Sequence, residues 1–376
     1  MSQLQIKRAE TGYEKKQFLS LPWTIYRDDP HWIPPLRMNQ KELLNFKRHP
    51  FYDNAEIQTF LAIRNGQPCG RIAAIVNHVH NERHDEKRGF FGFFESIDDS
   101  EVATGLFDTA CKWLADKGMT AVRGPMSPSF NYEIGLLIEG FNSPPTFMIT
   151  YNKKYYEKLI EDYGFRKTQD LYTFWGHIDM LETLDKKLAF VAEEARRRFG
   201  FEMRPMNKRN FEEDVRTFLR VFNEANGNHW GISPLTDGEI KHIATGMKQL
   251  IAPKMTRMAE VDGRVVGTCL GMLDYNPRIK AIDGRLFPVG FLRLLWNKQA
   301  IKKLRFVATH VLPEYQKWGL GLVLLADMVQ EILDWGITEV EFSWVAESNH
   351  LSRGTLERGG AIKTKTHRLY DYDLPQ

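Results

Sequence analysis

A basic turn with two glycines is the stretch of the sequence best suited to chemistry. It runs from Gln316 to Gly321, contains Lys317, and follows the β-prone run 304–311. The apolar-periodic run 322–333 behind it predicts a helix. The first amides of a helix have no intrahelical partner and lie at the positive end of its dipole. Strand, turn and helix together predict a cradle for an anion such as a phosphate group.

Other phosphate-binding and catalytic motifs are missing from the sequence. No Gly-Lys-Ser/Thr follows the turn, so it is not a Walker loop, and the third glycine of the dinucleotide fingerprint is absent. There is no nucleophile elbow, no His-Glu-x-x-His and no cysteine pair at metal-ligand spacing, so no metal site is predicted. The two glycines could also simply mark a tight strand-to-helix turn, which is the commoner situation.

The turn resembles the coenzyme A signature of the GNAT superfamily of acyltransferases. That signature is Gln or Arg, two residues, Gly, any residue, then Gly or Ala, and Gln316, Gly319 and Gly321 match it. Downstream, a predicted strand at 338–345 is followed by Asn349, which leads a short run ending in Gly-Gly-Ala. This is similar to the superfamily's closing motif, and a final β-prone run follows it. The resemblance implies the GNAT fold for this half of the chain.

The resemblance also implies acetyl-CoA or another acyl-CoA as co-substrate. The residues that it assigns to binding are Val311, Gln316, Lys317, Trp318, Gly319, Leu320, Gly321 and Asn349. In the superfamily, separated neighbouring strands expose a backbone N–H to the thioester carbonyl, and Val311 takes that position. Asn349 corresponds to the residue that contacts the pantetheine arm. We expect Trp318 to pack against the adenine or against protein.

Acyl transfer to an amine requires a polarised thioester carbonyl, a neutral amine and a proton for the departing thiolate. Superfamily members often use a Tyr seven residues after the Asn as the acid, but Leu356 stands there in this sequence. Candidate bases are Glu347, just past the predicted strand, and His310, beside Val311. Glu347 could instead cap a helix, and His310 could be a strand residue facing a neighbour.

Two functions fit these residues. In the first, the chain is an N-acyltransferase that moves an acyl group directly from acyl-CoA to a small-molecule or peptide amine in a ternary complex. In the second, it is a non-catalytic acyl-CoA-binding or regulatory protein, and Leu356 reflects the loss of catalysis. We favour the first because the glycine turn is intact.

Bulk properties add limits on partners and location. The 376 residues carry a net charge of only +3, which does not argue for nucleic acid. Three well-separated cysteines, Cys69, Cys111 and Cys269, suit a reducing compartment. No secretory signal and no apolar run of membrane-spanning length is apparent, so we expect a cytoplasmic protein without an integral membrane segment. The oligomeric state stays open.

A long internal repeat predicts two tandem GNAT-like domains. Gly66 and Gly263 lie in similar predicted hairpins 197 residues apart, and the same distance separates Asn152 from Asn349. A repeat this long indicates duplicated domains rather than a solenoid. We therefore predict an α/β protein with domains 1–175 and 176–376, each a twisted mixed sheet flanked by helices. A charged helix over 180–199 is expected to connect them.

The first half lacks the glycine turn. Its equivalent, Ser96–Val102, contains no glycine and is acidic, and acids would repel a pyrophosphate. The first half is therefore predicted to have kept the fold and lost the coenzyme site. It also carries an insertion, 124–145, that either packs a domain interface or lines a substrate pocket through Asn131, Tyr132 and Glu133.

A second insertion, 276–303, is apolar and aromatic with interspersed bases. One interpretation is a helix packed on the other domain. Another is a contact with an anionic membrane surface through Arg293, Lys298, Lys302 and Lys303. Our hypothesis is a third: the segment is a lid that borders the acceptor pocket and sets substrate size.

Overall fold

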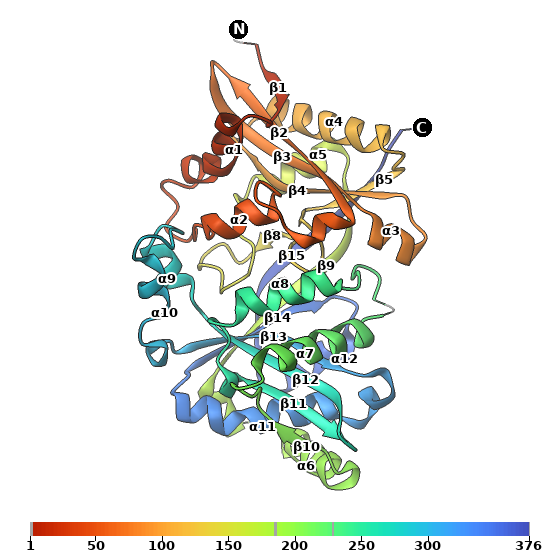
Figure 1. Cartoon of the computed structure of the whole chain (residues 1–376), viewed down its shortest axis with the longest axis vertical. Helices are drawn as coiled ribbons and strands as arrows, with labels where there is room; N and C mark the ends of the chain where they lie inside the picture. Colours follow the sequence, from red (N-terminus) through yellow and green to blue (C-terminus); the bar gives the residue numbers. More distant parts are fainter. Residues whose placement is uncertain (1–2, 184–185, 228, 376) are drawn as a thin grey trace. The chain divides into compact units, whose positions relative to one another are not determined.

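The computed structural model describes residues 3–183, 186–227 and 229–375, which form two compact units (Figure 1). The first unit comprises the chain up to Leu171, Asn276–Leu294, and the chain from Lys365 onward; the second comprises Tyr172–Tyr275 and Leu295–Thr364. The expected domains were contiguous, 1–175 and 176–376. The units differ from them chiefly because 276–294 and the C-terminal segment are grouped with the first unit. Within the described residues no helix is both long and apolar enough to cross a bilayer.

The first unit is built on a sheet in the order β1-β2-β3-β4-β5-β15, with β8 also pairing with β15. Its strands are β1 Gln5–Arg8, β2 Ala55–Arg64, β3 Gln67–Asn77, β4 Arg88–Ser96, β5 Ala121–Gly124 and β8 Leu136–Glu139, with a separate pair β6 Met126–Ser127 and β7 Glu133–Ile134. Its helices are α1 Gly12–Ile25, α2 Arg37–Leu43, α3 His78–His84, α4 Ser100–Asp116, α5 Tyr156–Tyr163, α9 Asn276–Ala281 and α10 Gly290–Leu295. In this sheet β4 and β5 run parallel, whereas β1 to β4 pair antiparallel.

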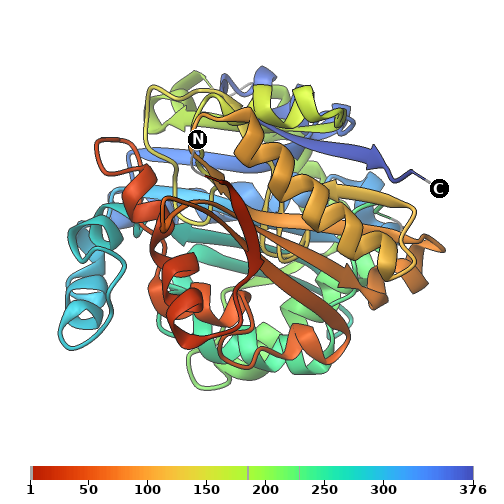
Figure 2. The ribbon, with the colours of Figure 1, turned by 90° about the horizontal axis from the view of Figure 1, so that it is seen from above.

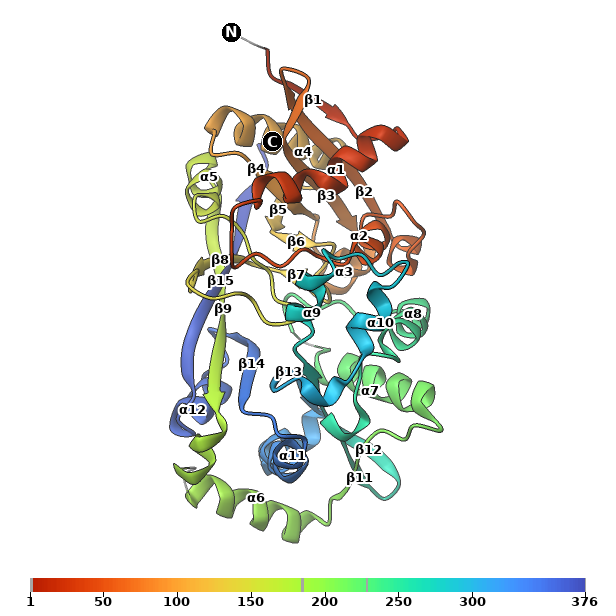
Figure 3. The same ribbon diagram turned by 90° about the vertical axis from the view of Figure 1, so that its left-hand side faces the viewer.

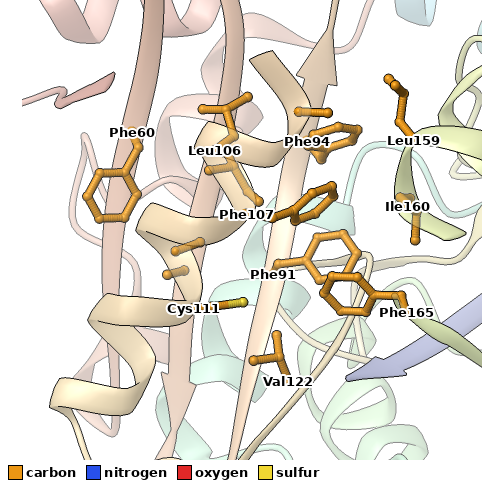
Figure 4. Close-up of a cluster of buried hydrophobic side chains, with 14 of the residues drawn as sticks. Phe60, Phe91, Phe94, Leu106, Phe107, Cys111, Val122, Leu159, Ile160 and Phe165 are labelled. Atoms are coloured by element: carbon orange, nitrogen blue, oxygen red, sulfur yellow. The ribbon is translucent and has the colours of Figure 1, made fainter. Parts of the chain in front are cut away.

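The core of the first unit lies between the sheet and α4, which runs alongside the strands (Figure 2). Asp99 fixes the start of α4, because its carboxylate accepts hydrogen bonds from the N–H groups of Glu101 and Val102 at 2.9 and 3.2 Å. From there α4 presents an apolar face to the sheet. Phe107 on this face stacks on Phe94 and meets Phe91 edge-on, with ring centroids 4.8 and 5.4 Å apart (Figure 4).

The second unit has a sheet in the order β9-β14-β13-β12-β11-β10. Its strands are β10 Glu202–Arg204, β11 Thr256–Val261, β12 Arg264–Leu273, β13 Lys303–Val311 and β14 Glu339–Ala346. Its helices are α6 Lys186–Phe199, α7 Phe211–Ala225, α8 Asp237–Met247, α11 Leu320–Trp335 and α12 His350–Arg358; the turn η5 Pro313–Trp318 leads into α11, which Figure 3 shows end-on. Both units are mixed sheets flanked by helices, so the predicted α/β architecture is confirmed.

The last strand of each half passes from one unit into the other. The boundary between the units falls inside β9 (Arg166–His177) at Leu171 and inside β15 (Ile362–Asp373) at Thr364. In the first unit β15 pairs antiparallel with β5, with Tyr370 opposite Gly124. In the second unit β9 is the neighbour of β14. Strand β9 was not predicted from the sequence, and the final strand was expected to lie entirely in the second half.

Candidate active site

The centre of the candidate site is a gap between two parallel strands of the second unit. The register of β13 and β14 runs from Lys303 opposite Glu339 to Phe306 opposite Phe342. Both strands continue beyond this paired part. A β-bulge interrupts the pairing of β13 with β12 at the same place. Leu270 and Gly271 are consecutive on β12, but their partners on β13 are separated by one extra residue, Val307. The carboxyl ends of β13 and β14 therefore lie at the same edge of the sheet but are not paired with each other there.

Val311 lies at this edge, as predicted. The N–H of the next residue, Leu312, donates to the carbonyl of Val266 on the β12 side at 2.9 Å. Amide groups alternate in direction along a strand, so the Val311 N–H points to the opposite side, towards β14. The Val311 carbonyl accepts a hydrogen bond from the Gln316 side-chain amide at 3.1 Å. Gln316 thus fixes the turn that follows the strand.

The two glycines of the turn differ in what the fold requires of them. Gly319 has a φ of +72°, a left-handed conformation that favours glycine. Gly321 has no such φ, and a Cβ there would meet only Thr309 Cγ2 at 3.7 Å, which is ordinary van der Waals contact. The protein itself therefore leaves room for a side chain at Gly321. A need for glycine at that position would have to come from a bound ligand.

The amino end of α11 carries no side-chain cap. The N–H groups of Leu322 and Val323 donate to the Gly319 carbonyl at 3.0 and 3.2 Å, but those of Leu320 and Gly321 precede the first such bond. Lys317 is exposed beside them. The arrangement is chemically suited to an anion, because bare amides, the helix dipole and one cation lie together.

Trp318 packs against protein rather than standing free over the turn. Its ring stacks on Phe199, the last residue of α6, with centroids 4.1 Å apart and planes 20° apart. Tyr315 meets it edge-on at 4.8 Å. Of the two expected contacts for Trp318, the structure therefore contains the one with protein.

Glu347 and Asn349 lie in the turn between β14 and α12, at the same edge as Val311. The Asn349 side-chain oxygen accepts a hydrogen bond from the Ser352 N–H at 3.0 Å and so caps α12. Asn349 rather than Glu347 is thus the capping residue. The Glu347 backbone carbonyl accepts from the Arg353 guanidinium at 3.0 Å, and its carboxylate is partly exposed.

His310 faces the helix side of the sheet opposite to α11. Its ring meets Phe222 and Phe218 of α7 edge-on at 5.0 and 6.0 Å, and its Nδ1 lies 3.1 Å from Asn226 Nδ2. Burial lowers the pKa of His310 from 6.5 to about 4, so the imidazole is neutral at neutral pH. A neutral imidazole can accept a proton, as the candidate base would have to. The close packing of His310 against α7 is also what we expect of a strand residue that faces a neighbouring helix.

A buried polar cluster that was not predicted from the sequence lies at the base of the gap. Arg305 of β13 donates from Nε to Ser343 Oγ of β14 at 2.8 Å, and Ser343 Oγ donates to Glu341 at 3.1 Å. All three side chains are almost fully buried. Burial lowers the pKa of Arg305 to about 10, while Glu341 and Asp274 oppose the shift. Charged residues in otherwise apolar strands were the available signal for this cluster.

The equivalent gap in the first unit is filled. The register of β4 and β5 also ends early, at Phe90 opposite Arg123, and Phe93 sits in a bulge with a φ of +51°. The Phe93 N–H donates to Ser127 Oγ of the insertion at 2.9 Å. A Cβ on Gly92 would lie 1.8 Å from the Met126 carbonyl oxygen, so the insertion packs directly onto β4.

The rest of the insertion also packs inside the first unit. Glu133 accepts a hydrogen bond from Gln40 at 3.1 Å, and burial raises the pKa of Glu133 to about 7. Tyr132 meets His49 and Phe51 edge-on at 5.5 and 5.9 Å. The Asp99 cap meanwhile leaves the amino end of α4 without the bare amides found at the amino end of α11.

The depressed pKa of His310 makes stability depend on pH. The unfolded state takes up a proton near pH 6.5 and the folded state only near pH 4, so between these values the unfolded state holds more protons. The free energy of unfolding should therefore fall as pH decreases through this window. We expect His310→Gln to lose that part of the pH dependence in denaturant titrations. The exposed His350→Gln is the matched control, and an unchanged slope in the His310 variant would contradict the assignment.

Comparison with known proteins identifies relatives over nearly the whole chain. A model of the acetyltransferase (GNAT) family matches residues 216–360. The chain is 33% identical to Protein YghO of Escherichia coli (strain K12), with 96% of this chain and 93% of that protein covered. It is 31% identical to the bacterial ceramide synthase of Caulobacter vibrioides, with 99% of this chain and 98% of that protein covered.

Solved structures share the fold at low sequence identity. The tandem GNAT protein from the clavulanic acid biosynthesis pathway superposes with a TM-score of 0.59 at 11% identity, covering 100% of this chain and 99% of that one. A GCN5-related N-acetyltransferase from Sphaerobacter thermophilus gives 0.55 at 14% identity, covering 99% and 96%. The chain belongs to the GNAT superfamily of acyltransferases, as a member with tandem GNAT domains.

Proposed function

We propose that the chain is an acyl-CoA-dependent N-acyltransferase with one coenzyme site, in the second unit. The observation that carries the proposal is the uncapped amino end of α11 next to the unpaired ends of β13 and β14. The amides around Gly319–Gly321 and the Lys317 ammonium would hold the pyrophosphate. The pantetheine arm would enter the gap past Asn349, and no metal takes part.

The gap supports direct transfer within a ternary complex. The Val311 N–H would donate to the thioester carbonyl oxygen, where negative charge develops as the amine nitrogen attacks the carbonyl carbon. The new C–N bond forms as the C–S bond breaks, the amine loses a proton and the thiolate gains one. Glu347 is our first candidate for the base because it follows β14 at the mouth of the gap. His310 is the second, since it is neutral and one residue from Val311.

We infer that the acceptor is an amphiphilic long-chain amine. The support is the relative named bacterial ceramide synthase, which aligns with this chain over almost its entire length. A ceramide is the amide of a fatty acid and a long-chain amino alcohol, so the name implies transfer to such an amine in that protein.

The cysteines are buried free thiols, which supports a reducing compartment such as the cytoplasm.

The alternative is a non-catalytic acyl-CoA-binding protein, which the Leu356 position favours. Release of free thiol from acyl-CoA separates the two. We expect thiol release and amide formation with long-chain amino alcohols, and much slower release with short amines. Binding of acyl-CoA without amide formation for any amine on a panel of both kinds would support the non-catalytic alternative and sink the proposed activity.

Gly321 provides a test of the coenzyme site. Its environment accommodates a Cβ, so Gly321→Val should fold with a Tm close to that of the wild type. The branched side chain would nevertheless block the approach of a pyrophosphate to the α11 amides, so acyl-CoA binding should be lost. Gly246→Val in α8, where a Cβ also meets open space, is the matched control. Calorimetry that shows two sites per chain, or unchanged affinity in the Gly321 variant, would rule this site out.

Glu347 should matter to turnover more than to binding. A general base contributes about a hundred- to ten-thousand-fold to rate. Glu347→Gln should lower kcat by a factor in that range while the Kd for acyl-CoA stays constant. Glu357→Gln, an exposed position on α12, controls for charge at this end of the unit. A normal kcat for Glu347→Gln across pH would exclude the residue as the base.

A further inference from the structure

An apolar protrusion of the first unit has no role in the proposed chemistry. Its tip consists of Phe287, Val289, Phe291 and Leu292, which are 73%, 52%, 44% and 57% exposed. We call these four residues the apolar tip. Four large apolar side chains so close together in sequence and so exposed are unusual for a soluble surface, and such patches mark contacts with a partner.

The base of the protrusion is firmly attached to the first unit. Asp283 accepts hydrogen bonds from the Trp23 indole at 2.5 Å and from the Arg37 guanidinium at 2.8 Å. The Arg37 guanidinium also lies over the Trp23 ring, 3.8 Å from its centroid. Next to this anchor, a Cβ on Gly284 would lie 2.2 Å from the Pro35 carbonyl oxygen, so the two backbones are in close contact. This agrees with the grouping of 276–294 with the first unit.

The protrusion is also packed internally. The Phe291 N–H donates to the Leu286 carbonyl at 2.7 Å, and the Arg278 guanidinium donates to the Leu294 carbonyl at 3.0 Å. Ile282 and Leu294 are buried. Figure 2 shows α9 and α10 standing apart from the strands of the first unit. The apolar tip is therefore held outward on an ordered base.

The charges around the tip are of one sign. Residues 284–296 contain Arg285 and Arg293 and no Asp or Glu. Arg285 and Arg293 flank the tip and are exposed, and Arg285 also pairs with the Asp283 carboxylate at 3.5 Å. Asp283, the nearest acid in the sequence, is engaged at the base by Trp23 and Arg37 as well. Exposed apolar side chains between exposed bases complement an anionic lipid surface, in which the former enter the headgroup region and the latter meet the phosphates.

We propose that the apolar tip docks the protein on an anionic lipid bilayer. The protein is held at the surface and does not span the membrane. The inference goes beyond the proposed acyl transfer and does not depend on it, because docking needs neither acyl-CoA nor an amine. The lid hypothesis for residues 276–303 stays a separate prediction.

Co-sedimentation of the full chain with lipid vesicles tests the proposal. We expect binding to phosphatidylcholine vesicles that contain phosphatidylglycerol, weaker binding to pure phosphatidylcholine, and loss of the difference at high salt. Each base near an anionic surface contributes about fivefold to partitioning, so Arg285→Glu with Arg293→Glu should weaken binding by more than about twenty-five-fold. Lys112→Glu with Lys158→Glu makes the same charge change on exposed helix positions of the same unit and is the control.

The apolar contribution is tested separately. Phe287→Ser with Leu292→Ser should abolish vesicle binding, whereas Tyr13→Ser, at a 70% exposed position of α1, should not. If the first pair lowers the Tm, Val289→Ser with Leu292→Ser takes its place. An environment-sensitive fluorophore on Leu292→Cys should shift to the blue with vesicles, and one on Lys158→Cys should not.

Three results would overturn the proposal. They are no vesicle binding by the wild type, equal binding by the tip variants, or a fluorophore at position 292 that stays in water. In each case the tip is instead a contact for another protein or ordinary packing. Because no substrate is present, none of these results bears on the acyl transfer reaction.

Discussion

The hydrogen bond between Arg305 and Ser343 joins β13 to β14 at the last point where the two strands are paired. A buried guanidinium is costly unless its donors are satisfied and an opposite charge is near, and Ser343 and Glu341 meet both needs. Beyond this point β13 has the bulge at Val307, and β13 and β14 are no longer paired with each other. The Val311 N–H can face an open gap because this pairing has stopped before it.

The two units show opposite outcomes for one local design. Each has a parallel strand pair whose register ends early, a bulge, and a helix that begins past the end of the strand. In the first unit the N–H of the bulged residue Phe93 donates to Ser127 Oγ, and Asp99 caps the helix. In the second unit the helix has a glycine in place of the cap and a lysine beside it. The gap is closed in the first unit and open in the second because a few side chains near the strand ends differ. The sheets around the two gaps are similar.

The local elements were largely predictable from the sequence, because hydrophobic periodicity, glycines and caps act over short distances. The hairpins, α11 and the turn between β13 and α11 all lie where the patterns placed them. The assignment of β9 and β15 to units was not predictable, since strand pairing depends on partners hundreds of residues away. The sequence suggested that acids close the first site by repulsion, but it could not show Ser127 in the gap. The roles of Glu347 and His310 stay predictions, because chemistry at a gap depends on where an acceptor binds.

The passage of β9 and β15 between the units has a consequence for how the chain is made. Strand β5 is synthesised long before residues 370–373, with which it pairs. Until those residues are synthesised, β5 keeps an unpaired edge, and exposed edges invite pairing with other chains. The β9 strand has meanwhile left the ribosome before its neighbour β14 exists. The sheet of the first unit can therefore be completed only after β15 has been synthesised, when most of the second unit already exists.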